Sequence, residues 1–429
     1  MNRHLLREII AFLGVSDSAM EYPHGLRRFR LRDWESSLDW MNLSGIALTF
    51  YDRLQKLGAV DVVPSSVGEA LAANLTNHRD RVAEMTQEFD SLNRQFECAG
   101  IEFAVWKGFS LIPDYCPDAC LRPTYDYDYL ISEEFVEPSR ALLQREGYVY
   151  RRENGAEHSL NFARKRRSPG GSPSPGGLYS ASLPRKVELH IKLWDEDAFG
   201  VPLRVPGRPL DRRSRRTWAG SCFYGLSEED SFLFQTLHVF QHILHDWCRL
   251  GWLWEIAYFI ENRRADAPFW NKFRSYLQGN APLTEVVSLV VSLAVRIFRA
   301  TLPEAIKDAV QSNMRSRVGL WVEQYGLNSA LDNFAENKYG LFLYREFIRD
   351  DVAWRQIRRK RLLPLHRPNR VGGTALSVPS VPLPSSWRQG WYVLQRVVHH
   401  TLKGAGYLWE SARWERLCRH RADRAFPVG

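Results

Sequence analysis

Cysteine is scarce in this chain, with 6 residues among 429. A chain of this length with so few cysteines lacks the disulfide framework of small secreted domains, and a reducing, cytoplasmic setting is the simpler interpretation. Cys116 and Cys120 have a spacing that occurs in zinc sites, but no second pair accompanies them. The cysteines therefore predict neither disulfides nor a structural zinc ion.

Long hydrophobic runs are also missing. The apolar stretch within residues 1–14 is too short for a signal peptide, and no small-residue cleavage site follows it. Nowhere does the sequence approach the roughly 20 consecutive apolar residues of a membrane-spanning helix. We therefore expect no transmembrane segment, and a protein that is soluble or peripheral to a membrane.

Residues 1–350 carry almost no net charge. The whole sequence carries a net charge of +9, whereas residues 351–429 alone hold 15 basic and 4 acidic residues. The preceding residues are consequently close to neutral, and the basic character belongs to the C-terminal tail. The overall charge thus bears on the contacts of the tail rather than on an active site.

Two acidic residues alternate with tyrosines along a predicted strand, residues 125–131. Because side chains two apart along a strand share one face, Asp126 and Asp128 project together. Neighbouring carboxylates repel each other and lose hydration on burial, so a divalent cation is the usual reason for keeping such a pair. Mg²⁺ fits best because it prefers oxygen ligands and phosphate partners, and Mn²⁺ is the alternative.

A third acidic residue lies on a later predicted strand, residues 186–194. The apolar residues of this strand alternate with Glu188, His190 and Lys192, which therefore share one face. We expect this strand to be the neighbour of the strand that carries the two aspartates. Three carboxylates from two strands can hold one or two metal ions for in-line phosphoryl chemistry.

A Lys-Gly turn at 107–108 follows a predicted buried strand, 101–106, and a short helix is expected at 109–112. Glycine at such a corner lets backbone N–H groups reach an anion, although it also suits an ordinary turn. The lysine could contact a phosphate or pair with Asp126. Arg122, just before the aspartate strand, could neutralise phosphates or brace its loop.

These segments together resemble a known superfamily. The motifs WKGFS, LRPTYDYDYLI, LLQREGY and VELHIKLW are similar to those of the nucleotidyltransferases that include DNA polymerase β. More narrowly, they resemble a bacterial family of uncharacterised nucleotidyltransferases, over roughly residues 35–290. The resemblance implies that the paired aspartates and the third acid bind Mg²⁺, and that the glycine turn receives the NTP. One departure is that Phe109 separates Gly108 from the hydroxyl, which belongs to Ser110.

The resemblance implies a magnesium-dependent enzyme that moves a nucleoside monophosphate from an NTP, such as ATP, to an acceptor and releases pyrophosphate. Its catalytic and metal-binding residues would be Asp126, Asp128 and Glu188. The residues expected to bind the nucleotide are Lys107, Gly108, Ser110, Arg122, His190 and Lys192. The acceptor stays open among a small molecule, a sugar, RNA and a protein side chain. The alternative is a non-catalytic protein that keeps the fold and binds a partner through its cleft or its basic tail.

The order of the segments predicts an α+β protein with a small mixed sheet between helical regions. The predicted regions are an N-terminal helical region 1–95, a nucleotidyltransferase core 96–205, a C-terminal helical domain 226–350 and a basic tail 351–429. Within the core, the stretch 164–184 is rich in Gly, Pro and Ser, has no periodic apolar positions and is expected to be a mobile insertion. The strongly apolar residues 282–302 are expected at the centre of the helical domain.

Two features of the helical domain have a chemical and a structural interpretation. His238, His242 and His245 share one helix face, where they could bind Zn²⁺ or, as we favour, pack as ordinary partly buried histidines. Glu255 lies among apolar residues and is expected to pair with Arg249 or to reach the cleft.

The tail is predicted to contain an amphipathic helix over residues 386–424. Apolar residues line one stripe of that helix: Trp387, Trp391, Leu394, Val398 and Leu402. Together with the basic residues, this stripe could lie on an anionic membrane, contact nucleic acid or dock on the chain's own helical domain.

Overall fold

The computed structural model divides the chain into two compact units. The first unit comprises residues 1–241 and 248–314, and the second comprises residues 242–247 and 315–429. The structure describes residues 1–16, 22–151, 159–164, 177–312, 314–332, 337–363 and 385–425. The predicted helical domain 226–350 contributes residues to both units. The division of the chain into the four predicted regions remains a prediction.

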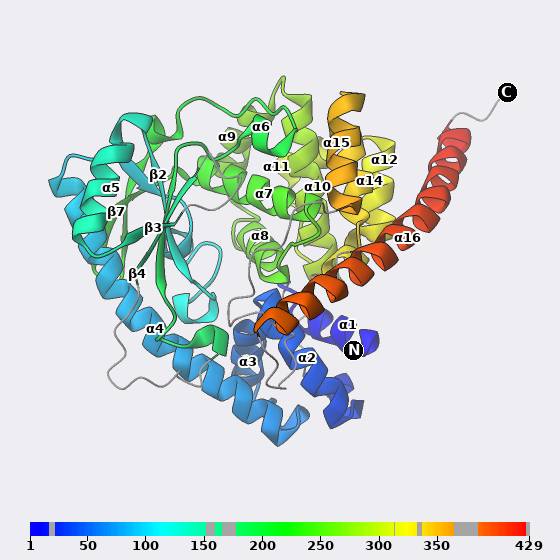
Figure 1. Ribbon diagram of the computed structural model, residues 1–429, viewed down its shortest axis with the longest axis horizontal. Coiled ribbons are helices and arrows are strands. Elements are labelled where there is room, and N and C mark those ends of the chain that lie inside the picture. The colour runs from blue at the N-terminus through cyan, green and yellow to red at the C-terminus, as the bar shows by residue number, and fades with distance from the viewer. Residues whose placement is uncertain are drawn as a thin grey trace. The chain divides into compact units, whose positions relative to one another are not determined.

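The first unit is built on a mixed sheet of seven described strands with helices before and after it in the chain (Figure 1), which confirms the predicted α+β class. The spatial order of the strands is β3-β4-β5-β2-β1-β7-β6. Their bounds are β1 Phe103–Val105, β2 Asp126–Ile131, β3 Val149–Arg151, β4 Ser159–Arg164, β5 Arg185–His190, β6 Ser214–Trp218 and β7 Ser221–Gly225. The central strand β2 pairs in parallel with β5 and antiparallel with β1.

The register between β2 and β5 sets Asp128 opposite Glu188. It confirms that the strand with the third acid is the direct neighbour of the aspartate strand. The predicted strand 186–194 is nevertheless too long, because β5 ends at His190. His190 is also the last residue of β5 that pairs with β2 or β4 among the described residues. Lys192 therefore lies beyond the sheet, and it is exposed.

Helices precede and follow the sheet in the first unit. The N-terminal ones are α1 Arg3–Phe12, α2 Leu31–Ser44, α3 Ala47–Lys56 and α4 Ser65–Cys98. The others are α5 Val136–Arg145, α6 Glu196–Phe199, α7 Glu228–Leu244, α8 Leu250–Asn262, α9 Ala267–Leu277, α10 Ala281–Phe298 and α11 Glu304–Ser312. The last residues of α7 belong to the second unit.

The long helix α4 covers one face of the sheet (Figure 1). Its Phe89 and Phe96 pack on Tyr127 and Tyr129 of β2, with ring centroids 6.3 and 4.9 Å apart. Since side chains alternate along a strand, the aspartates of β2 point to the opposite face. The tyrosine face of the predicted strand is thus the packed face, and the acidic face is the one that α4 leaves uncovered.

Helix α10 is the one described helix that is long and apolar enough to cross a membrane by length and composition. Within its 18-residue window, 72% of the residues are buried inside the protein. It packs against α8, α9 and α11, which are helices of the same unit. This burial is typical of a core helix and agrees with the central position predicted for residues 282–302.

The second unit is helical in its described residues. Its helices are α12 Ser316–Trp321, α13 Leu327–Leu331, α14 Tyr339–Phe347, α15 Asp351–Leu362 and α16 Ser385–Ala425. Asp246 joins the first segment of this unit to the second, since its carboxylate accepts from the Gly340 amide at 2.6 Å and pairs with Arg361 at 2.5 Å. A Cβ at Gly340 would lie 2.6 Å from the Leu244 carbonyl oxygen, so this close approach requires glycine.

The prediction of an insertion without apolar anchors over 164–184 is wrong at its C-terminal end. Tyr179 is buried, and its hydroxyl donates to Asn42 Oδ1 at 3.1 Å. A single aromatic residue among Gly and Ser produces no periodicity, which is why the sequence pattern gave no sign of this anchor. The predicted mobility of residues 165–176 lies outside the described residues.

Candidate active site

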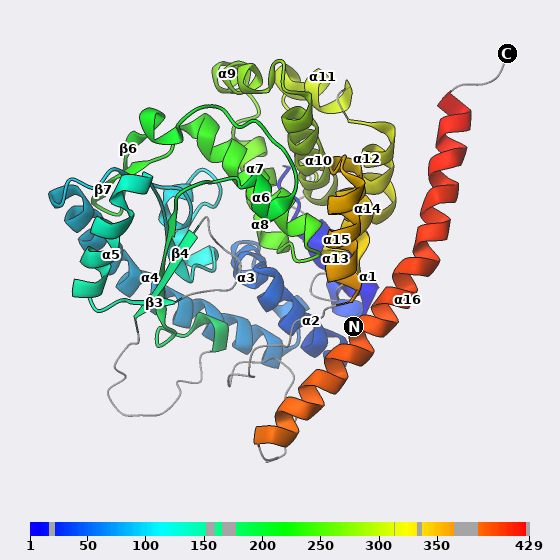
Figure 2. The ribbon, with the colours of Figure 1, turned by 45° about the horizontal axis from the view of Figure 1, so that its top comes forward.

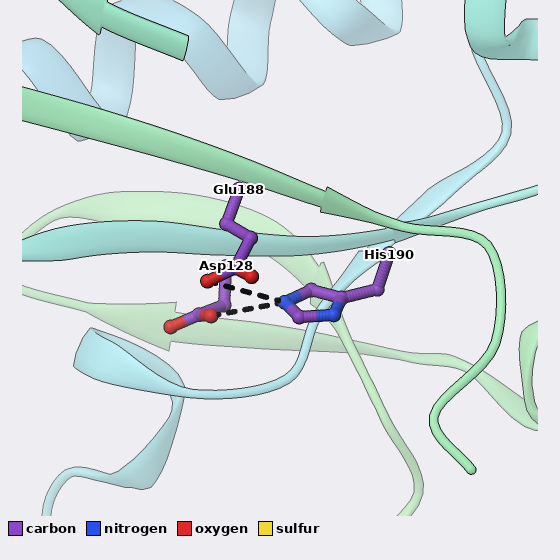
Figure 3. A group of neighbouring side chains, drawn as sticks. All are labelled: Asp128, Glu188 and His190. Carbon is purple, nitrogen blue, oxygen red and sulfur yellow. Dashed lines mark hydrogen bonds and ion pairs between the residues drawn. The ribbon is translucent and has the colours of Figure 1, made fainter. Parts of the chain in front are cut away.

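Asp128 is the centre of the acidic face of β2. It is buried, with a relative exposure of 3%, and its Oδ1 lies 3.1 Å from His190 Nε2 and 3.3 Å from Lys107 Nζ. One ligand atom each from Asp128, Glu188 and His190 lies within 4.8 Å of the others, and the three side chains point toward one another (Figure 3). The parallel pairing of β2 and β5 produces this group.

Glu188 is the accessible member of the group, because its side chain keeps 25% of its exposure. The hydroxyl of Ser159 on the neighbouring strand β4 donates to its Oε1 at 3.0 Å. Its Oε2 lies 3.8 Å from His190 Nε2. Glu188 is therefore held from both sides while part of its carboxylate remains free to reach solvent.

Asp126 precedes this group on the same face of β2 but is not one of its three members. Burial raises the pKa of Asp126, and the negative charges of Asp128 and Glu188 raise it further. Burial also opposes ionisation of Asp128, but the charge of Lys107 and the hydrogen bond from His190 outweigh it and lower the pKa of Asp128. The face thus concentrates negative charge that one lysine balances only in part.

The donor set fits a divalent cation. Carboxylate oxygens are the ligands that Mg²⁺ prefers, and a neutral imidazole nitrogen beside them also suits Mn²⁺. A bound cation would relieve the repulsion that raises the pKa of Asp126. The predicted residues Asp126, Asp128 and Glu188 share one face. His190, which the sequence indicated only as a nucleotide-binding residue, lies beside Asp128 and Glu188 as a potential metal ligand.

The Lys-Gly turn lies beside this face. Gly108 has a φ of +65°, a left-handed conformation in which any other residue is strained. The predicted helix after it is a single 3₁₀ turn, Gly108–Leu111. The buried Ser110 hydroxyl donates to the Lys107 carbonyl at 3.1 Å, so in this structure it closes the turn. Lys107 itself pairs with Asp128 rather than with Asp126.

Arg122 braces the loop before β2. Its Nε forms a buried ion pair with Oε1 of Glu255 on α8 at 3.0 Å, and its Nη1 donates to Thr124 at 3.2 Å. The observed partner of Glu255 is thus Arg122, where the sequence favoured Arg249. Of the two interpretations of Arg122, this geometry favours the brace over contact with a phosphate.

Replacing Glu255 by Leu is expected to destabilise the protein by about 3–5 kcal/mol, because the Arg122 charge would remain buried without its partner. In the double variant Arg122→Met/Glu255→Leu both charges are absent, and most of the lost stability should return. Urea unfolding curves measure both effects. A double variant no more stable than Glu255→Leu would contradict the pairing, and loss of nucleotide binding in a stable double variant would favour a phosphate role for Arg122.

The sequence did not indicate Arg81 as a residue that supports the site. Arg81 is fully buried in α4, and it donates to the Thr124, Tyr125 and Ser180 carbonyls at 3.0, 3.4 and 3.0 Å. It thereby fastens the loop that leads into β2. The sequence signal that could have indicated this buried arginine is its position beside the apolar stripe of a long helix.

The sequence also did not predict the β6–β7 hairpin, which supports the Lys-Gly turn. Trp218 stacks on Phe109 with ring centroids 4.4 Å apart, and Arg216 donates to the Ser110 carbonyl at 3.0 Å. Ala219 and Gly220 both have positive φ, of 47° and 80°, at the turn of this hairpin. An Ala-Gly pair between two short runs is a weak hairpin signal, because such turns favour Asn or Asp first.

Two of the three histidines lie in α7 and His245 directly follows it, and each packs against a different aromatic ring. His238 lies 4.6 Å from the Trp252 ring, His242 4.9 Å from Trp247 and His245 6.0 Å from Tyr344, between centroids. They do not belong to the group of potential metal ligands found among the described residues. These contacts support the interpretation of the three residues as packed histidines.

A strand bearing two aspartates, a parallel neighbour bearing a third acid and a Lys-Gly turn beside them together define a nucleotidyltransferase-like protein. Residues 31–299 match the protein family described as uncharacterised nucleotidyltransferase, and the chain belongs to that family. The matched segment covers more than half of the sequence and includes the whole sheet. Comparisons with curated proteins and with solved structures gave no match.

Proposed function

We propose that the protein is a magnesium-dependent nucleotidyltransferase that moves a nucleoside monophosphate from an NTP to an acceptor and releases pyrophosphate. The observation that carries the proposal is the group of Asp128, Glu188 and His190 within 4.8 Å, on the face of the sheet opposite α4. Membership of a nucleotidyltransferase family supports the same reaction class. A divalent ion held there would neutralise the phosphate charge and orient the reacting oxygens.

In this proposal Asp128 and Glu188 hold the cation, and Asp126 completes the oxygen ligands from the same strand face. His190 orients Asp128 through the 3.1 Å contact with its Oδ1. In the ion-bound state the same nitrogen, without its proton, would leave this contact and become a ligand, which would make Mn²⁺ an acceptable substitute for Mg²⁺. Trp106 covers the other side of His190 with ring centroids 5.0 Å apart, which fixes the plane of the imidazole.

The nucleotide would bind at the turn that begins with Lys107 and Gly108. The lysine ammonium, already 3.3 Å from Asp128, can approach a phosphate that bridges to the cation. We assign Ser110 a supporting role through the turn that it closes, and Lys192 an outer contact because it is exposed just beyond β5. Arg122 holds the loop of the aspartate strand in place.

The test is incubation of the protein with each α-³²P-labelled NTP, Mg²⁺ and a cell lysate. We expect one labelled acceptor, equal release of pyrophosphate, and loss of both signals in EDTA. Glu188→Gln, which removes one ligand charge, serves as the inactive control. Labelling that survives in Glu188→Gln protein would refute the assignment of the site.

The same experiment decides between the enzyme and the alternative. A protein that binds Mg²⁺ and NTP but releases no pyrophosphate with any acceptor would be a binding protein that keeps the fold. The lysate should be a cytoplasmic one, since we propose a reducing compartment in which the six cysteines, all free thiols, stay reduced.

A further inference from the structure

Helix α16, Ser385–Ala425, consists of an N-terminal section, residues 385–406, and a C-terminal section, residues 407–425, with different surroundings in the second unit (Figure 2). The C-terminal section packs on other helices of that unit. Tyr407 and Trp414 are buried, and both stack on Phe342 of α14 with ring centroids 5.0 and 5.8 Å apart. Ion pairs of Glu415 with Arg317 and of Arg421 with Glu323, at 2.9 and 2.6 Å, secure the same section.

Large apolar side chains are exposed along α16, most of them in its N-terminal section. We call five of them the tail stripe: Trp391, Leu394, Val398, Leu402 and Trp409, with relative exposures of 46%, 52%, 49%, 67% and 79%. At 100° per residue these positions lie within about 80° of one another. Val393, Val397 and Leu408 are also exposed and extend the apolar face to about half of the helix circumference.

The tail stripe faces away from the helices that hold α16. Tyr407 and Trp414, the buried contacts, lie roughly half a turn from Trp409 around the helix axis. The described residues of the second unit can therefore keep their core intact while they leave the stripe exposed. A contiguous exposed apolar face of this size marks a surface for a partner.

The charges in the sequence of the same part of the helix indicate the chemistry of that partner. From Ser385 to Trp409 the sequence contains the basic residues Arg388, Arg396 and Lys403 and no Asp or Glu. The first acidic residue of α16 is Glu410, whose carboxylate accepts from Tyr325 within the second unit at 2.8 Å. An apolar face with tryptophans, in a sequence that contains basic residues and no acidic ones, is complementary to an anionic lipid surface.

We propose that α16 lies flat on an anionic membrane surface through its N-terminal section and Trp409, with the tail stripe in the headgroup–acyl boundary. A nucleic acid fits this surface less well, because Val398 and Leu402 cannot stack on bases and three basic residues neutralise few phosphates. A second copy of the chain also fits less well. The seam of a two-stranded coiled coil is a narrow stripe, whereas this apolar face covers about half of the circumference.

The first measurement is flotation of the full-length protein with vesicles of phosphatidylcholine alone and with 30% phosphatidylglycerol. We expect flotation with the anionic vesicles at least tenfold above that with the neutral ones. Raising NaCl from 0.1 to 0.5 M should reduce binding without abolishing it, because salt screens the basic residues but not the apolar burial. Failure to float with anionic vesicles would overturn the proposal.

Leu394→Asp and Val352→Asp form a matched pair for the second measurement. Both residues belong to the second unit and are 52% exposed, so each variant adds one negative charge at an equally exposed site. We expect partition to anionic vesicles to fall at least tenfold for Leu394→Asp and less than twofold for Val352→Asp, with Leu402→Asp repeating the loss. Equal partition of Leu394→Asp and Val352→Asp would overturn the assignment of the stripe.

Two further outcomes would identify a different occupant and refute the proposal. Sedimentation that shows a dimer for the native protein and a monomer for Leu394→Asp would assign the stripe to a second copy. Binding of a labelled RNA oligonucleotide that Leu394→Asp abolishes, without vesicle binding, would assign it to nucleic acid. Pyrophosphate release measured without vesicles is expected to be unchanged in Leu394→Asp, because the substitution lies outside the candidate active site.

Discussion

Replacing Asp128 by Asn is expected to lower nucleotide transfer on the order of 10³-fold, the largest effect of any single substitution considered. A metal ion contributes several kcal/mol of transition-state stabilisation, and about 1.4 kcal/mol corresponds to each tenfold change in rate. Asp128 contacts Lys107 and His190 and lies within 4.8 Å of Glu188. Its negative charge therefore interacts with every other group of the candidate metal site. Asparagine keeps the size of the side chain and removes that charge.

The fold should survive the substitution. Asp128→Asn loses the ion pair with Lys107, but it also removes one of three mutually repelling carboxylates. Thermal unfolding in EDTA is therefore expected to change little, while Mn²⁺ binding followed by electron paramagnetic resonance should weaken. Asp39→Asn makes the same chemical change at an exposed position of α2 and should affect neither measurement. Native transfer rates in Asp128→Asn protein would exclude Asp128 as a ligand.

The local periodicity of the sequence was sufficient to predict the centre of the site. Alternation along 125–131 placed the aspartates and tyrosines on opposite faces, as the packing of Tyr127 and Tyr129 on α4 confirms. Alternation also placed Glu188 and His190 together on a second strand. Periodicity has this power because a strand has only two faces, and one of them must be buried.

Contacts between distant segments could not be predicted in this way. The Arg122–Glu255 ion pair and the contact of Lys107 with Asp128 depend on which loop approaches which helix or strand, and no local pattern encodes that choice. The end of β5 at His190 likewise depends on where its pairing with β2 and β4 stops. For the same reason Tyr179 looked like part of an unanchored loop although it is buried.

Arg81 is the clearest example of such a distant contact, and replacing it by Met is expected to lower the free energy of unfolding by about 3 kcal/mol. Three backbone carbonyls would lose a charged donor, and each such hydrogen bond is worth roughly 1.5–3 kcal/mol. The loss is smaller than the sum because the arginine charge is itself costly to bury, and burial lowers its pKa to about 10.

Arg79→Met provides the matched control, since Arg79 is an exposed neighbour on the same helix and its replacement should change stability by less than about 0.5 kcal/mol. Arg81→Lys keeps the charge, but one ammonium group cannot reproduce the fork that reaches Thr124, Tyr125 and Ser180. Its stability should therefore lie between those of the native protein and Arg81→Met. Urea unfolding monitored by tryptophan fluorescence gives all three values.

Because the carbonyls of Thr124 and Tyr125 directly precede Asp126, Arg81→Met should also reduce Mn²⁺ binding while the protein is still folded. Arg81→Met protein with native stability and native Mn²⁺ affinity would mean that the loop before β2 holds its position without Arg81.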